Sequence, residues 1–447
     1  MTHQPLKLLL YGKDARTDAI AEGLRRSGSG CELTICAPFR SPGLVAKADR
    51  FVAASLTNLS QMVAVARELR PDLVVIAPED PLSVGLVDEV AKLGVACFGP
   101  TRALARVETS KSWTRSLLAR HGIAGNPRHR TFHSADDLVE YVGELGTVVV
   151  KPDGLTGGKG VKVQGEQLAS AEDAVAYARL LLASDGSVVI EERLEGEEFS
   201  LQTITDGEAV VHCPIAQDHK RAHSGDVGPN TGGMGSYSCS DGSLPFLTKE
   251  DVALARAINE ATVDALGREV GTPYRGVLYG GFMAVADGVR LIEYNARFGD
   301  PEALNVLPLL EGDLVELLWA TAAGRLSRVE TSFVPRATVC KYVVPRSYPE
   351  GDSDDAVIST DESVLGSELR CYWAATTLAA DSSIRLTGSR ALAFVGIGEN
   401  LAEAELLAER GASSVSGPVR HRRDIGTEEA VGRRIEHMRQ IRSATSP

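Results

Sequence analysis

The sequence predicts an α/β protein of about three domains, with a doubly wound parallel sheet first and a small α+β domain last. The 447 residues are enough for about three domains at roughly 100 to 200 residues each. In the first hundred residues, short β-rich runs alternate with helical patterns, which is typical of a parallel sheet covered by helices. Glycine-rich loops then separate shorter strands, and a further pattern of strands and a closing helix begins near residue 333.

The N-terminal domain is predicted to span residues 1–104. Strands are expected at residues 7–11, 31–37, 73–77 and 95–98, with a helix at residues 15–26. The Gly99-Pro100-Thr101 turn closes this pattern and marks the boundary.

The second domain is predicted at residues 105–332 and the third at 333–447. The second should start with a helix that carries Lys111, followed by strands at 148–150, 188–190, 276–286 and 289–294. Residues 218–240 are rich in glycine and lack periodicity, so they predict a long loop, and long loops inside domains are usually functional. The third domain should have its own strands and a helix at 400–410.

Charge and hydropathy exclude several classes of partner. The net charge is -13 and no block of lysine and arginine could neutralise a run of phosphates, so nucleic acid is not expected as a partner. No stretch reaches the roughly 18 apolar residues of a membrane span, and residues 1–13 do not resemble a signal peptide, so we expect a cytoplasmic protein without a membrane partner. The seven cysteines have no metal-ligand spacing and are expected to be reduced and structural.

A lysine at a strand end and a second lysine in a glycine loop form the first motif. Residues 148–161 read VVVKPDGLTGGKGV, which places Lys151 at the strand end and Gly157, Gly158 and Lys159 in the loop. Glycine lets backbone N–H groups approach phosphates, and the lysines supply point charges. The alternative is a surface hairpin with two solvated lysines. No Ser or Thr follows Lys159, so this is not a Walker A loop.

An apolar strand that runs into an acidic stretch forms the second motif. Residues 188–200 read VVIEERLEGEEFS, with five carboxylates between Glu191 and Glu198. Taken alone, a solvated acidic turn is the simpler interpretation. Next to a phosphate loop, however, the strand edge could bind adenine and a carboxylate could hold ribose hydroxyls.

The third motif, LIEYNARFGDPE at residues 291–302, indicates a metal site. In an extended strand Glu293 and Asn295 point to the same side, so their oxygens could bind Mg²⁺ together with ATP phosphates. Arg297 lies on that side too and could hold a carboxylate or a phosphoryl group. An edge strand with an alternating polar face is the alternative.

Together these segments resemble the ATP-grasp superfamily, and within it the phosphoribosylamine-glycine ligase family of purine biosynthesis, in the form found in archaea. The likeness covers nearly the whole chain and includes EDPL at 79–82, FGPT at 98–101, QDHKR at 217–221, GPNTGGMG at 228–235, EALNVLPLL at 302–310, KYVVP at 341–345 and RDIG at 423–426. The resemblance implies an ATP-grasp fold behind an N-terminal pre-ATP-grasp domain. It also implies an ADP-forming ligase that uses ATP with Mg²⁺ or Mn²⁺ and joins an amino acid to an amine through an acyl phosphate, as a monomer or homodimer.

The resemblance also implies a role for individual residues. Lys111, Lys151, Gly157, Gly158 and Lys159 would meet ATP phosphates. Glu191 with the backbone after it would frame adenine, and Glu198 would hold the ribose. Glu293 and Asn295 would bind the metal. Catalytic roles are implied for Arg297, Lys159, Asp218, Lys220 and Asn230. The substrates would be bound by Gly12, Arg16, Glu79, Asp80, Thr231, Gly232, Gly233, Met234, Arg297 and Asp300.

The N-terminal phosphate loop departs from the family pattern. The family has G-x-G-G-R-E-H-A after the first strand, where this chain reads GKDARTDA at residues 12–19. Asp14 and Ala15 replace two glycines, which puts a carboxylate at a helix N-terminus that should receive a phosphate. The second loop, usually A-P-G-N-A-G, reads APFRSPG at 37–43.

These changes favour an amine other than phosphoribosylamine, in another pathway such as one of specialised metabolism, with glycine or a similar amino acid as the acid. The alternative is the purine ligase itself, with Lys13, Arg16 and Arg40 offsetting the changes. A catalytically silent nucleotide-binding module is the remote third option.

Overall fold

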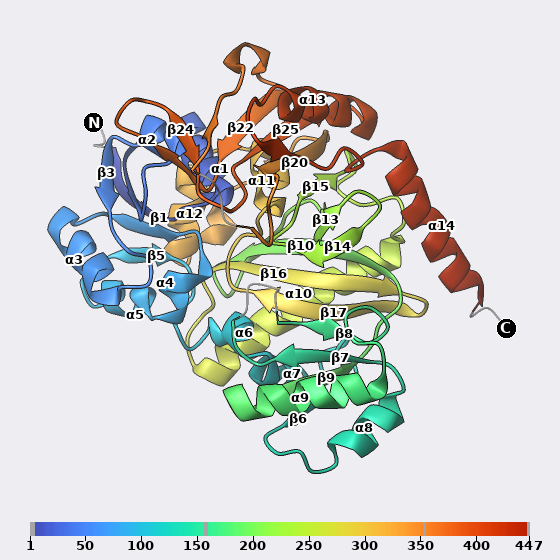
Figure 1. Ribbon diagram of the computed structural model, residues 1–447. Coiled ribbons are helices and arrows are strands. Elements are labelled where there is room, and N and C mark those ends of the chain that lie inside the picture. The colour runs from blue at the N-terminus through green and yellow to red at the C-terminus, as the bar shows by residue number, and fades with distance from the viewer. Residues whose placement is uncertain (1–4, 156–159, 352–354, 445–447) are drawn as a thin grey trace.

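The computed structural model describes residues 5–155, 160–351 and 355–444, and it divides visibly into three parts (Figure 1). The N-terminal sheet lies on one side and a small lobe below. The C-terminal strands lie above, with helix α14 extending from them (Figure 1). A sheet in the middle of the molecule connects the three parts.

The N-terminal sheet is parallel and has the order β3-β2-β1-β4-β5, which confirms the predicted doubly wound sheet. Its strands are β1 (Leu6–Tyr11), β2 (Cys31–Ala37), β3 (Arg50–Ala53), β4 (Leu73–Ile76) and β5 (Ala96–Phe98). The helices are α1 (Ala15–Arg26), α2 (Pro42–Lys47), α3 (Leu59–Leu69), α4 (Glu79–Ser83) and α5 (Leu86–Ala91). Residues 8–11 of β1 are buried because helices cover both faces of the sheet.

The strand order reverses between β1 and β4, and this position marks a candidate binding site. In doubly wound sheets, ligands bind outside the carboxyl ends of the strands where the order reverses. The loop at residues 12–14 follows β1, and Glu79 and Asp80 follow β4. Both predicted substrate segments therefore leave the sheet at this point.

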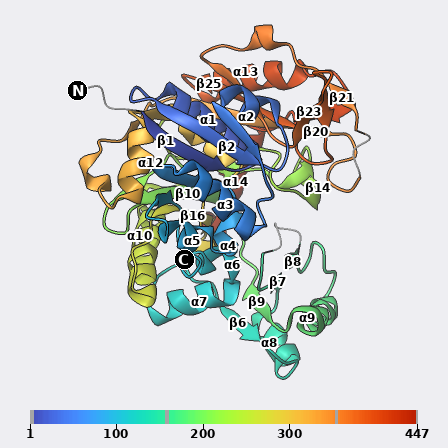
Figure 2. The ribbon, with the colours of Figure 1, turned by 90° about the vertical axis from the view of Figure 1, so that its left-hand side faces the viewer.

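Two antiparallel sheets are formed by the middle part of the chain, with orders β6-β9-β7-β8 and β11-β10-β16-β17. The first belongs to the small lobe that both ribbon views place below the rest (Figures 1 and 2). Its elements are β6 (His129–Phe132), β7 (Val148–Pro152), β8 (Lys162–Val163), β9 (Val188–Glu192), α8 (Leu138–Leu145) and α9 (Ala171–Asp185). The second sheet contains β10 (Glu197–Thr205), β11 (Val210–His212), β16 (Gly276–Val285) and β17 (Gly288–Asn295), and it is backed by α10 (Lys249–Val270).

Two sequence predictions for this region are wrong in detail. The helix expected from residue 105 is two helices, α6 (Arg106–Thr109) and α7 (Lys111–Arg120), because extended Ser110 ends one and caps the other by accepting from Trp113 N. The long loop expected at 218–240 contains short strands, β12 (Gln217–Asp218), β13 (Arg221–His223), β14 (Val227–Asn230) and β15 (Gly235–Ser238). Their glycines allow close strand pairing: a Cβ on Gly235 would lie 2.1 Å from the Cys340 carbonyl oxygen.

The last part shares a sheet with this segment, in the order β12-β15-β20-β25-β22. Its long strands are β20 (Ala337–Pro345), β22 (Leu369–Trp373) and β25 (Leu392–Gly398), covered by α13 (Leu401–Ser413). Shorter strands are β18 (Leu310–Glu311), β19 (Ser332–Phe333), β21 (Val357–Ile358), β23 (Thr376–Leu378), β24 (Ile384–Leu386) and β26 (Val419–Arg420). The remaining helices are α11 (Glu302–Val306), α12 (Leu314–Ala322) and α14 (Glu428–Ala444), and α12 packs against β4 and β5 of the N-terminal sheet.

Two further sequence expectations concern the chain as a whole. All seven cysteines are free thiols, as expected of reduced, structural cysteines. In the described ranges, none of the helices is both long enough and apolar enough for a bilayer crossing.

Candidate active site

A buried triad of charges links the sheet of the small lobe to helix α7. Lys151 at the end of β7 lies 2.6 Å from a Glu191 carboxylate oxygen on β9, and Arg115 of α7 donates to both Glu191 oxygens at 2.6 and 2.9 Å. Burial favours the neutral acid, but Arg115 and Lys151 outweigh it and lower the pKa of Glu191 to about 2. Burial lowers the pKa of Lys151, with Glu191 acting against the change. Glu191 therefore fixes the Lys151 ammonium by charge pairing.

A β-bulge in strand β17 adds a backbone acceptor to this triad. Gly281 pairs with Glu293 and Phe282 with Leu291, which leaves Ile292 as an extra residue of β17. The Ile292 carbonyl accepts from Lys151 at 3.1 Å and from Arg115 at 2.7 Å. The bulge thus brings the predicted phosphate lysine next to the predicted metal-binding strand.

Glu293 and Asn295 lie on one face of β17, as predicted, and both are half-buried. Glu293 has no hydrogen-bond partner among the described residues. Burial favours the neutral amine of Lys220, but the charge of Glu198, followed by that of Glu293, raises the pKa of Lys220 above its ordinary value. The Asn295 Oδ1 accepts from Arg297 at 3.2 Å.

This pair fits a divalent cation that takes most of its ligands from phosphates and water. One carboxylate and one amide oxygen are hard ligands of the kind that Mg²⁺ binds in such sites. No cluster of three or more His, Cys, Asp or Glu side chains suited to a metal exists in the described ranges.

Lys220 and Glu198 form a second cation-carboxylate pair beside the triad. The Lys220 ammonium donates to Glu198 at 2.5 Å, and both side chains are partly exposed. Burial of the Glu198 carboxylate favours its neutral form, but Lys220 lowers the pKa of Glu198 below its ordinary value. The two predicted ligand-binding residues thus hold each other in this structure.

Arg297 lies at the centre of an ion-pair network instead of pointing freely into a cavity. It contacts Glu79 of α4 at 3.2 Å and Glu108 of α6 at 3.1 Å. Burial favours the neutral guanidine, but Glu108 and Glu79 raise the pKa of Arg297. Through Asn295, this arginine connects the N-terminal part to β17, the strand predicted to bind the metal.

The segment 230–235 wraps around Asp218. Thr231 N and Oγ1 donate to the Lys220 carbonyl at 2.8 and 2.9 Å, and Gly233 N donates to Thr231 at 3.0 Å. Gly233 has φ +102°, and a Cβ there would lie 2.6 Å from Asp218 Oδ1, so glycine allows the close approach. Asn230 and Met234 lie at the two ends of this turn, in β14 and just before β15.

Two carboxylates, Asp218 and Glu302, interact electrostatically near this segment. Asp218 Oδ1 is buried without a hydrogen-bond partner in the described part of the chain, and Glu302 accepts from the Tyr279 hydroxyl at 2.6 Å. Burial first, and the Glu302 charge second, raise the pKa of Asp218 well above its ordinary value. A cationic ligand group would be stabilised here.

The loop after β1 is closed onto itself. Asp14 caps α1 by accepting from Thr17 N at 2.9 Å and Thr17 Oγ1 at 2.7 Å, and it forms an ion pair with Arg16. Burial opposes ionisation, but Arg16 and Thr17 lower the pKa of Asp14 to about 2. Arg16 also donates to the Phe298 carbonyl at 2.7 Å. A Cβ on Gly12 would lie 2.0 Å from Thr17 Oγ1, so the loop packs tightly.

Other predicted residues lie at the rim. Lys13 contacts Asp80 at 3.2 Å, and both are partly exposed. Lys111 at the start of α7 donates to the Gly154 carbonyl at 2.9 Å, at the entrance to the glycine loop. Gly157, Gly158 and Lys159 lie outside the described residues.

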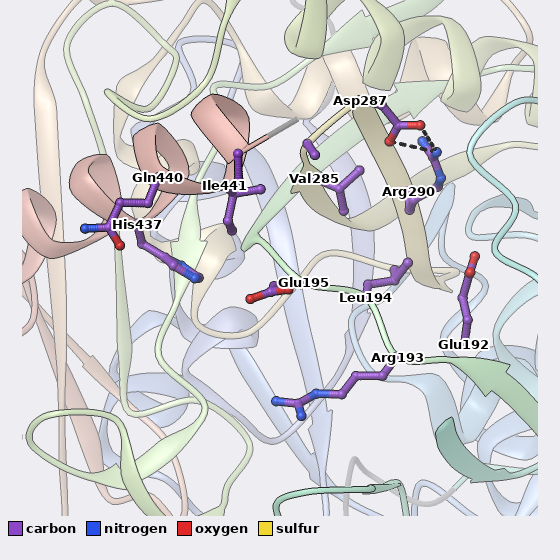
Figure 3. Close-up of a pocket in the computed structure, with 12 residues that line it drawn as sticks. Glu192, Arg193, Leu194, Glu195, Val285, Asp287, Arg290, His437, Gln440 and Ile441 are labelled. Atoms are coloured by element: carbon purple, nitrogen blue, oxygen red, sulfur yellow. Dashed lines mark hydrogen bonds and ion pairs between the residues drawn. The ribbon is translucent and has the colours of Figure 1, made fainter. Parts of the chain in front are cut away.

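A cavity of about 500 Å³ lies on the outer side of the segment that joins β9 to β10 (Figure 3). Glu192, Arg193, Leu194 and Glu195 line one side, and the tip of the β16–β17 hairpin and helix α14 line the rest (Figure 3). The Lys151, Lys220 and Glu293 side chains do not line it. The cavity therefore adjoins the backbone expected to frame adenine, but it is separate from the charged cluster.

The structure brings Lys151, Glu191 and the strand that carries Glu293 together, and it adds residues that the motifs do not mark. Arg115, Glu108, Tyr342 and Arg390 each contact a predicted site residue, and Tyr279 contacts Glu302, which the motifs did not mark as a site residue. Arg115 is four residues after Lys111 on one helix, a spacing that could have suggested it. Arg390 meets Asp300 from 90 positions away in sequence, and local pattern gives no signal for that contact.

Family models match nearly the whole chain. They are described as the N domain, the ATP-grasp (A) domain and the C domain of phosphoribosylglycinamide synthetase, and they match residues 6–108, 109–303 and 338–428. The domain limits predicted above stay a prediction; these ranges begin and end at different residues.

Relatives of similar length carry the name phosphoribosylamine-glycine ligase. The one from Methanococcoides burtonii is 44% identical over 98% of this chain and 100% of its own, and the one from Pyrococcus horikoshii is 44% identical over 99% of each. Among solved structures, phosphoribosylamine-glycine ligase from Thermotoga maritima superposes with a TM-score of 0.77 at 25% identity, over 93% of this chain and 99% of that one. An L-amino acid ligase from Bacillus licheniformis, at 17% identity and TM-score 0.63 over 93% of this chain and 98% of that one, shares the fold.

Proposed function

Because the chain belongs to the phosphoribosylglycinamide synthetase family and is an ADP-forming ATP-grasp ligase, we propose that it joins glycine to phosphoribosylamine. The loop sequence alone favours a different amine, whereas full-length relatives at 41–46% identity carry the name of the purine ligase. The observation that supports ligase chemistry is the cluster of Lys151, Lys220, Glu293 and Asn295 around one strand.

In the proposed reaction, a glycine carboxylate oxygen attacks the γ-phosphorus of ATP and ADP leaves. The amine nitrogen then attacks the acyl phosphate carbonyl, the C–O bond to phosphate breaks, and phosphate leaves with loss of an amine proton. Lys151 and Lys220 would offset the negative charge of the transferring group. Glu293 and Asn295 would hold a divalent cation, for which we propose Mg²⁺, and the cation would supply Lewis-acid stabilisation of phosphate charge.

The acid substrate would lie between the strand end at Arg297 and the segment 230–235. Asp218 and Glu302 face this space and would attract the ammonium group of an amino acid. Gly232 and Gly233 would let the backbone approach the acyl group closely and exclude water from it.

A second candidate differs only in the amine. Asp14 occupies the N-terminus of α1 with its own carboxylate and holds Arg16, so two groups suited to a phosphate are already used. A phosphate 4 Å from this carboxylate would be repelled by about 1 kcal/mol in water and about 4 kcal/mol at an effective dielectric of 20. This observation favours an amine without a phosphate at that position.

A steady-state assay with glycine, Mg-ATP and freshly generated phosphoribosylamine separates the two candidates. A kcat/KM of about 10⁴ M⁻¹s⁻¹ or more supports the first. Turnover with a panel of unphosphorylated amines but not with phosphoribosylamine supports the second. If the first candidate fails, Asp14→Gly tests the reason, because glycine costs only a few tenths of a kcal/mol at an N-cap and removes the charge.

The oligomeric state, monomer or homodimer, remains a prediction that sedimentation at working concentration would test.

A further inference from the structure

A single arginine from the last part of the chain reaches into the candidate active site. Arg390 lies two residues before β25, and its backbone carbonyl accepts from Ala375 N at 2.9 Å. Its guanidinium lies 4.4 Å from the ring centre of Tyr342 on β20, and only 15% of its side chain is exposed. Both its main chain and its side chain are therefore held in place by the C-terminal sheet.

The Arg390 guanidinium binds two segments at once. Its Nη1 donates to the carbonyls of Gly232 and Gly233, the second at 3.0 Å, and to the Asp300 carbonyl at 3.1 Å. Its Nη2 donates to the Asp300 carboxylate at 3.1 Å, and the other oxygen of that carboxylate accepts from the Tyr342 hydroxyl at 2.5 Å. Lysine could not satisfy these acceptors together, because its single ammonium lacks the planar fork.

The two segments held by Arg390 belong to the acid site. Gly233 lies against Asp218 and Pro301, and Thr231 holds the Lys220 main chain. Asp300 precedes Pro301 and Glu302, the carboxylate whose charge acts on Asp218. Removing the guanidinium would leave three carbonyls and a buried carboxylate without this donor, which costs free energy. The turn would therefore rearrange to reduce that cost.

We propose that Arg390 is a positioning residue for the ligase reaction, which it serves by fixing the turn at Gly232 and Gly233 against Asp300. The C-terminal part thereby completes a site whose lysines and metal ligands all come from the middle of the chain. This inference rests on the proposed acyl phosphate chemistry, but not on the identity of the amine.

Loosening this turn is predicted to weaken the coupling between ADP release and product formation. When the turn is in place, the acyl phosphate carbonyl reacts with an amine nitrogen and one product forms for each ADP. When the turn is loose, water attacks the same carbonyl, so that phosphate and free amino acid form and ADP is released without product. The ratio of ADP to product therefore reports the position of the turn.

The test compares Arg390→Met with Arg390→Lys, with hydroxylamine as the amine. Hydroxylamine converts the acyl phosphate to a hydroxamate, so the assay is independent of the natural amine. Arg336→Met is a matched control, since Arg336 also bridges two carboxylates, Glu368 at 2.8 Å and Glu399 at 3.2 Å, within the C-terminal part.

For Arg390→Met we expect the ratio of ADP to hydroxamate to rise at least about fivefold and the KM for the amino acid to rise about tenfold, while the KM for ATP changes by less than about twofold. Arg390→Lys should recover part of the coupling, and Arg336→Met should match the wild type. Asp300→Asn, which keeps the shape but removes the charge partner, should shift coupling in the same direction as Arg390→Met.

Unchanged coupling and unchanged KM for the amino acid in Arg390→Met would overturn the inference. Equal loss of coupling in Arg336→Met, or loss of Mg-ATP binding and of the cooperative melting transition in both Arg390→Met and Asp300→Asn, would also overturn it, because the arginine would then be structural only. Failure of the proposed function has a different signature, since wild-type protein would form hydroxamate but no product from phosphoribosylamine.

Discussion

Glu191→Gln should destabilise the protein and shift its alkaline activity limit, whereas the same change at the next residue should do neither. Glu191 and Glu192 are neighbours on β9 whose side chains lie on opposite sides of the strand. Glu191 is 4% exposed and neutralises two buried cations, Arg115 and Lys151. Glu192 pairs with Arg128, whose side chain is 62% exposed.

The size of the stability loss in Glu191→Gln follows from the burial and the pKa of Glu191. The fall in the pKa of Glu191 from 4.5 to about 2 corresponds to about 3 kcal/mol of preferential stabilisation of the charged form. Breaking a buried ion pair from one side typically costs 3–5 kcal/mol. We therefore expect a loss of about 3 kcal/mol for Glu191→Gln and less than about 1 kcal/mol for Glu192→Gln, because surface pairs contribute little.

The dependence on pH has a definite sign. The folded-state pKa of Glu191 is below its ordinary value, so its contribution to stability is complete above about pH 4.5 and is lost as the pH falls toward about 2. Lys151 affects stability in the opposite direction. Burial lowers its pKa, so its charged form destabilises the folded protein, and the charge of Glu191 recovers part of that loss. Without Glu191, the pKa of Lys151 should fall further and activity should decline at a lower alkaline pH.

Thermal melting of wild type, Glu191→Gln and Glu192→Gln between pH 2 and 8, together with the pH profile of ADP formation, provides the measurement. The difference between wild type and Glu191→Gln should shrink as the pH approaches 2. Equal melting temperatures for the two variants at pH 7, or an unshifted alkaline limb in Glu191→Gln, would refute the buried-triad explanation.

Three further predictions concern the reaction. Glu293→Ala should reduce ADP formation at least about a hundredfold. The melting temperature should stay near the wild-type value, because Glu293 has no hydrogen-bond partner in the described part of the chain. Near-normal turnover would show that Glu293 is not a metal ligand. Arg297→Lys should lower kcat/KM at least about tenfold, or roughly 1.4 kcal/mol, since one ammonium cannot hold Glu79, Glu108 and Asn295 together, and unchanged kinetics would contradict the network's role. Chelation of divalent cations should abolish turnover, readdition of Mg²⁺ should restore it, and chromatography should find ADP with phosphate; AMP as main product would exclude an acyl phosphate.

The local pattern of residues in the sequence was sufficient to predict much of the fold. The helix at residues 15–26 and the strand at 31–37 coincide with α1 and β2, because a cap at Asp14 and a buried apolar run are strong local signals. Alternation in the strand also placed Glu293 and Asn295 on one face. The short strands within 217–238 were missed because their glycines remove the apolar periodicity on which strand prediction depends.

The sequence by itself determined the family, the parallel N-terminal sheet, and the strands that carry Lys151, Glu293 and Asn295. These features depend on residue types close together in the chain, where periodicity, caps and glycine leave a direct record. Only the tertiary structure decided how those groups are used: Glu191 between Arg115 and Lys151, Arg297 between Glu79 and Glu108, and Arg390 across Gly232, Gly233 and Asp300. Each of these ion pairs joins segments distant in sequence, and its charge balance depends on burial that only the packed chain creates.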